Sequence, residues 1–86
     1  MWYGIVKYSF DSDKNVLGPY KTEEEAWNGI EQSANEEYVI SSEVNEWVSE
    51  INKDRESGEI TITDYFDDRN DITEFFIIEI DNTKLI

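Results

Sequence analysis

The stretch Thr22–Asn52 reads TEEEAWNGIEQSANEEYVISSEVNEWVSEIN, and the rest of the chain is best interpreted around it. It contains nine glutamates and no lysine, arginine or histidine. Its apolar residues, which include Trp27 and Trp47, recur every three or four positions, as they do in an amphipathic helix. The stretch therefore predicts helix, with one face in a core and an uncompensated negative charge on the other.

The beginning of this helix is well marked. Thr22 is a suitable N-cap, and Glu25, three residues later, completes the pattern of a capping box. Glu23, Glu24 and Glu25 also place negative charge at the positive end of the helix dipole. These acids therefore have a structural reason to be where they are.

Two apolar stripes follow one another along the stretch, rotated by roughly 70° at about 100° per residue. We therefore expect a break near residues 38–42 and two helices, with one bent helix as the alternative. Gly58 would end the second helix, and Lys53 and Arg55 would suit the negative end of its dipole. The first stripe is Ala26, Trp27, Ile30, Ala34 and Tyr38, and the second is Ile40, Val44, Trp47, Val48 and Ile51.

Three further segments predict strands, since β-branched and aromatic residues recur in them: 2–10, 59–67 and 72–81. The last two are joined by a short polar link and form an antiparallel hairpin. The final segment is apolar on both faces, which predicts the central strand of the sheet. We expect a single α+β domain over residues 1–86, with order β-α-α-β-β and a three-stranded antiparallel sheet that packs its helices on one face.

Residues 11–15 resemble part of a calcium loop, because Asp11, Asp13 and Asn15 alternate. The resemblance stops there, since Val16 occupies the position of the loop glycine and Thr22 that of the bidentate glutamate. We interpret residues 11–15 as a polar turn and residues 16–20 as a connector. No metal or other cofactor is expected.

Composition excludes several kinds of chemistry. The chain has no cysteine and no histidine, so it lacks a thiolate ligand, a disulfide, and the usual general base. Adjacent carboxylates are frequent, but none lies in an apolar context that would separate two pKa values as catalysis requires. We therefore do not expect an enzyme.

The formal net charge is −14, from 21 acidic and 7 basic residues. Such a charge repels nucleic acid and anionic membranes, so the natural partner is a basic protein surface. There is no apolar run of the roughly 20 residues that a membrane span needs, and the first residues do not form a signal peptide. A cytoplasmic protein is expected.

Two acidic groups are candidates for binding such a partner. Glu36, Glu43 and Glu50 recur every seven residues with Glu46 between the last two, which on a helix gives one stripe of carboxylates about 10 Å apart. A solvated helix face would normally interleave lysine, and this stretch has none. The second group surrounds the predicted hairpin turn. It comprises Asp64, Asp67, Asp68 and Asp71, and Trp47 and Tyr65 are candidate aromatic anchors.

Three segments resemble small acidic proteins of Gram-positive bacteria and their mobile elements. They are YGIVKYSFD at 3–11, YKTEEEAW at 20–27 and TEFFIIEI at 73–80. The resemblance covers about half of the chain and implies no catalytic residue. In size and charge the protein is also similar to phage-borne anti-CRISPR and anti-restriction inhibitors, many of which mimic nucleic acid.

The leading hypothesis is an acidic inhibitor that occupies the basic nucleic-acid groove of a bacterial nuclease, such as a CRISPR effector. An immunity protein or antitoxin that neutralises a cognate toxin is the first alternative. A homodimeric interaction module is the second, because one face of the sheet would expose apolar side chains. That face would carry Tyr3, Ile5, Tyr65, Phe75 and Ile77, or the set that alternates with them.

Overall fold

The structure is a computed structural model. It describes the backbone of residues 1–9, 11–44 and 48–80, and the side chains of residues 1–9, 14–40 and 48–80. Its elements are β1 (Trp2–Tyr8), β2 (Asp11–Tyr20), α1 (Glu23–Val44), β3 (Val48–Asp54), β4 (Glu59–Tyr65) and β5 (Asn70–Glu79). No helix in the described ranges is long and apolar enough to cross a membrane.

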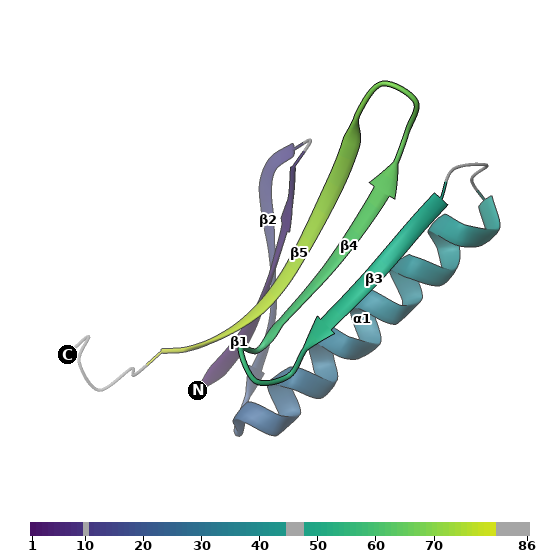
Figure 1. Ribbon diagram of the computed structural model, residues 1–86. Helices are drawn as coiled ribbons and strands as arrows, with labels where there is room; N and C mark the ends of the chain where they lie inside the picture. Colours follow the sequence, from purple (N-terminus) through teal and green to yellow (C-terminus); the bar gives the residue numbers. More distant parts are fainter. Residues whose placement is uncertain (10, 45–47, 81–86) are drawn as a thin grey trace.

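In the described part of the chain, the strands form one five-stranded antiparallel sheet in the order β2-β1-β5-β4-β3. α1 lies diagonally along one face of that sheet (Figure 1). The prediction of three strands and two helices was wrong. The hairpin of β4 and β5 was predicted correctly, and so was the central position of the last strand, which pairs with β1 on one side and β4 on the other.

β2 is the first strand that the sequence did not predict, because the expected turn and connector at residues 11–20 form a strand along β1. Asp, Asn, Gly and Pro all weigh against a strand. They are tolerated here because β2 is an edge strand, where a proline need not supply a ladder hydrogen bond. The pairing with β1 is irregular at both ends, and Gly18 has a φ of 111°, which favours glycine.

β3 replaces the predicted second helix. α1 continues through residues 38–42 without the expected break and ends at Val44, and the chain then returns as a strand beside β4. Pairing with β4 decides this structure, since it places Ile51 opposite Ile62 at the edge of the core. Gly58, expected to end a helix, instead has a φ of 73° in the turn between β3 and β4.

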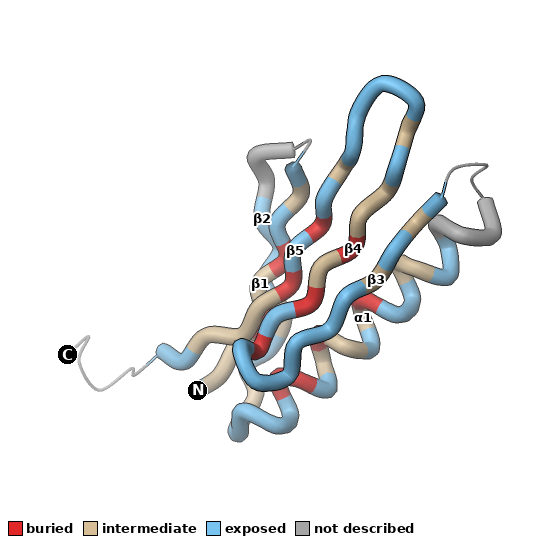
Figure 2. Tube along the Cα trace, viewed as in Figure 1, coloured by how far each residue is buried: buried red, intermediate tan, exposed pale blue. Residues whose placement is uncertain are grey.

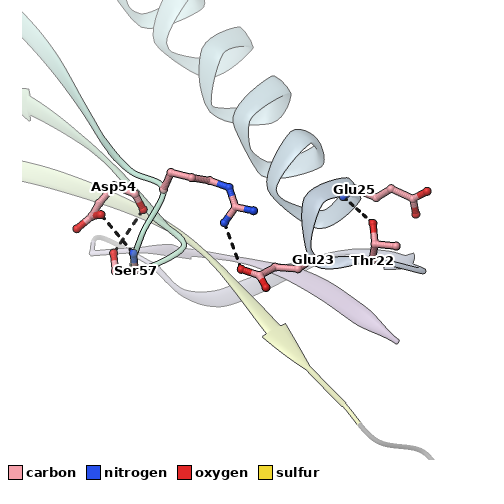
Figure 3. A network of polar contacts seen from close by, with 6 residues as sticks. Thr22, Glu23, Glu25, Asp54 and Ser57 are labelled. Atoms are coloured by element: carbon pink, nitrogen blue, oxygen red, sulfur yellow. Dashed lines mark hydrogen bonds and ion pairs between the residues drawn. The ribbon is translucent and has the colours of Figure 1, made fainter.

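The start of α1 is capped as predicted by Thr22, whose Oγ1 accepts a hydrogen bond from the Glu25 amide at 3.1 Å (Figure 3). The Glu25 carboxylate reaches back, but it accepts from the amide of Lys21 at 3.0 Å rather than from that of Thr22. Lys53 and Arg55 do not end a helix. From β3 and the turn after it they pair with Glu31 and Glu23 of α1, at 3.5 and 3.2 Å.

The core lies between α1 and the sheet, where buried residues of both layers meet (Figure 2). Gly4 of β1 permits close packing there, because a Cβ at this position would collide with the Cγ2 of Ile30. A Cβ at Gly29 of α1 would likewise collide with the phenol group of Tyr20. The buried apolar residues are Val6, Ala26, Trp27, Ile30, Ala34, Ile60, Ile62 and Phe75.

The opposite face of the sheet, which we call the open face, carries no further element in the described ranges (Figure 1). Register assigns its residues, since Ile5 and Phe76 are cross-strand partners that alternate with the buried Val6 and Phe75. Phe75 and Ile77 therefore face α1. The open face shows Tyr3, Ile5, Val16, Phe76 and Ile78 toward β2, with Tyr65 and Val48 toward β3.

Candidate functional site: the acidic end

The β4–β5 hairpin and the C-terminal half of α1 lie at one end of the molecule (Figure 1). The Phe66 amide donates to the Arg69 carbonyl at 2.9 Å, which leaves Asp67 and Asp68 at the hairpin tip. Both aspartates are exposed. We call this region the acidic end and define it by Glu37, Glu50, Asp64, Asp67, Asp68 and Asp71.

Asp64 is the centre of the acidic end on the side of the sheet that faces α1. It is the register partner of Asp71 on β5 and accepts a short hydrogen bond, 2.6 Å, from the Ser49 hydroxyl of β3. From α1, Tyr38 donates to the Ser49 carbonyl at 3.5 Å. Hydrogen bonds to Ser49 of β3 therefore connect this strand with Asp64 of β4 and with Tyr38 of α1.

Glu37 is the member of the acidic end that sequence reasoning did not single out. It lies on α1, half-buried. Burial raises the pKa of its carboxyl, and the nearby negative charge of Asp64 raises it further. The only sequence signal for Glu37 was its position beside Tyr38, at the edge of the predicted inward stripe. The sequence did not show which strand would face this part of the helix.

On the open face of the same end, Tyr65 donates a hydrogen bond to the Glu50 carboxylate at 2.7 Å. This bond raises the pKa of the Tyr65 phenol, and burial and the Glu50 charge add to the effect. The side chain of Tyr65 stays 40% exposed. The hydrogen bond to Glu50 fixes the ring of Tyr65 at the surface, and its role as an aromatic anchor stays a prediction.

Arg69 supplies the positive charge at the hairpin. Its guanidinium lies 3.4 Å from the Asp71 carboxylate and 4.9 Å from the centre of the Phe66 ring. It compensates Asp71, which is largely covered, and leaves the charges at the tip, Asp67 and Asp68, exposed to a partner.

The predicted helical stripe of carboxylates does not exist as such. Glu36 is exposed on α1, whereas Glu50 lies on β3, so these two do not share a helix face. Glu43 belongs to the last turn of α1, where only the backbone is described, and Glu46 and Trp47 lie outside the described residues. Glu50 thus lies on the strand beside the hairpin, on the face opposite to Asp64, and its side chain is joined to Tyr65 of β4.

A metal does not explain the cluster, because no group of three or more acidic residues in the described ranges is arranged to hold one. Residues 11–15, considered as a partial calcium loop, begin β2 instead. The side-chain Nδ2 of Asn15 donates a hydrogen bond to the Tyr8 hydroxyl at 3.5 Å. The side chains of Asp11 and Asp13 lie outside the described residues.

Comparisons of the chain with protein-family models, with curated proteins and with solved structures found no match.

Proposed function

We propose that this protein is an acidic inhibitor whose acidic end occupies the basic nucleic-acid groove of a bacterial nuclease, as an anti-CRISPR or anti-restriction protein does. The supporting observation is that carboxylates from α1, β3, β4 and the β4–β5 hairpin converge at one end, with Asp67 and Asp68 exposed at the tip. A narrow hairpin tipped with negative charge can enter a groove built for phosphates.

Some of the acidic residues are already paired with bases of the chain. Near the start of α1, the acids Glu23 and Glu31 already have partners in Arg55 and Lys53. The hairpin acids have Arg69, which pairs with Asp71. Among the described residues, Asp67 and Asp68 take part in none of these ion pairs, so the tip keeps its negative charge for a basic groove. Electrostatic steering would make that association fast at low salt.

The test is displacement of a fluorescent DNA duplex from a panel of bacterial nucleases, including CRISPR effectors, followed by anisotropy. We expect release that weakens as salt rises, because the contacts are charge pairs. Charge reversal at the tip, D67K with D68K, should abolish release.

The matched control reverses two exposed acids at the opposite end, E56K with E79K, and changes the net charge equally. It should retain most of the inhibition. Equal loss in both double variants would show that total charge alone acts, and would contradict a site at the hairpin. Failure to displace DNA from any nuclease would favour the alternative of an immunity protein or antitoxin.

A further inference from the structure

The open face is the second surface that calls for a partner. Tyr3, Ile5, Phe76 and Ile78 form an apolar group there, and Val16 extends it at 61% exposure. This group lies toward β2, away from Glu50 and Asp54 on β3. No element of the described residues covers it.

Register makes this surface complementary to itself. Between β1 and β5 the cross-strand partners on the open face are Tyr3 with Ile78, Ile5 with Phe76 and Lys7 with Glu74. Consider a two-fold axis parallel to the strands, above the open face and midway between β1 and β5. This axis would place each residue of one copy over its own cross-strand partner in the second copy. Ile5 would meet the other copy's Phe76 and Lys7 the other copy's Glu74, while the reciprocal contacts would form as well.

We propose that the open face binds a second copy of this chain, sheet against sheet, about an axis between β1 and β5. The proposal does not depend on the proposed inhibition, because the hairpin tip stays outside the contact. Since the axis is parallel to the strands, both acidic ends would lie at the same end of the dimer. That arrangement would double the negative surface offered to a groove.

Charge favours a second copy over a different protein. Lys14 on the edge strand β2 lies directly opposite Lys7, whose other cross-strand partner is Glu74 on β5, so Lys7 has an acid beside it within the same copy and Lys14 has a like charge. In the proposed dimer β2 lies over β4 of the other copy, which brings Lys14 over Thr61 and next to Glu59. The few bases of this face would therefore be compensated by acids of the same face.

The available area is near the lower limit for a dimer. Four strands of each copy overlap, and with strands about 4.8 Å apart and about 23 Å long the flat footprint is about 450 Å² per copy. Side-chain relief enlarges this toward the roughly 600 Å² per partner found at the lower limit of stable interfaces. A dimer that dissociates measurably is expected, which allows its affinity to be compared between variants.

Sedimentation equilibrium of the full chain provides the first test. The wild type should dimerise, and the dimer should tighten as salt rises, because salt screens the repulsion between two chains of charge −14. K7E and E74K should each weaken the dimer by about tenfold, since each acts at both symmetric contacts. The double variant K7E/E74K should restore it. A chain that is monomeric at every salt concentration would overturn the proposal.

Crosslinking provides the second test, because the chain has no native cysteine. Position 7 lies next to the axis, so a K7C variant should be joined to its copy by a short bis-maleimide. Position 52 lies on the open face of β3, where the two copies would be about 24 Å apart across the axis. N52C should not be joined. Crosslinking of N52C but not K7C would indicate pairing through the β3 edge and would overturn the proposal.

Discussion

At the scale of single residues, Glu37 has the clearest consequence for stability. Burial and then the Asp64 charge raise its pKa above the ordinary value of a glutamate, so the folded state binds its proton more tightly than the unfolded state. The stability that this proton contributes is fully present at a pH below the pKa that the Glu37 carboxyl has in the unfolded state. It is lost as the pH rises through the folded pKa.

We therefore expect Glu37→Gln to raise the melting temperature at neutral pH and to reduce the gain in stability that the wild type shows on acidification. Thermal unfolding across a pH series measures both effects. Glu36→Gln is the control, because it removes the same charge from an exposed neighbouring position. A rise with Glu36→Gln as large as that with Glu37→Gln would show that net charge alone is responsible.

Gly4 gives a second residue-scale prediction, because a side chain there would collide with Ile30. Gly4→Ala should destabilise the fold by about 1–3 kcal/mol through overpacking. Ile30→Ala should cost about 2–5 kcal/mol by leaving a cavity. Because the second change makes room for the first, the double variant should lose less than the sum. Additive losses in denaturant unfolding would contradict the contact.

At the scale of elements, β3 is the segment whose structure depends most on its neighbour. Asn52 faces Thr61 across the open face. Asn52→Thr should stabilise the protein by about 0.2–1 kcal/mol, since a threonine pair across strands is favourable. Asn52→Ala should not, because alanine suits helices and is depleted in strands. Stabilisation by alanine but not threonine would support a helix at residues 48–54.

The sequence predicted those elements whose structure depends on residues that are adjacent in the chain. The Thr22 cap, the apolar residues Phe75 to Ile78 and the polar link at residues 68–71 each predicted their element from nearby residues alone. β2 and β3 could not be found in this way. One is rich in turn residues and the other continues a helical pattern, and both become strands only because β1 and β4 offer free edges.

The candidate site shows the same limit. Asp64, Asp67, Asp68 and Asp71 were predicted as a cluster, and they are close together because they share one hairpin. The link from Glu50 to this cluster was missed, since it depends on β3 lying beside β4. The electrostatic effect of Asp64 on Glu37 was missed for a similar reason, because it depends on how α1 crosses the sheet.

At the scale of the whole molecule, 21 acids in 86 residues repel one another in the folded state. We expect the melting temperature to rise between about 0.01 M and about 1 M sodium chloride, where the Debye length falls from about 30 Å to about 3 Å. Thermal scans at fixed pH measure this. A fall in melting temperature would mean that the ion pairs of Lys53 and Arg55 with α1 outweigh the repulsion.

The two proposed surfaces respond to salt in opposite ways. Capture of a basic groove by the acidic end should weaken as salt rises, and self-association through the open face should strengthen. A salt series on the free protein and on its complex therefore separates the two.

The most direct measurement of the central claim is amide hydrogen exchange of the protein, free and saturated with a nuclease that it inhibits. Residues 64–71 form the acidic hairpin, and residues 54–59 form the turn at the opposite end. The account predicts slower exchange at residues 64–71 in the complex and unchanged exchange at residues 54–59. Slower exchange at residues 54–59, with none at the hairpin, would contradict it.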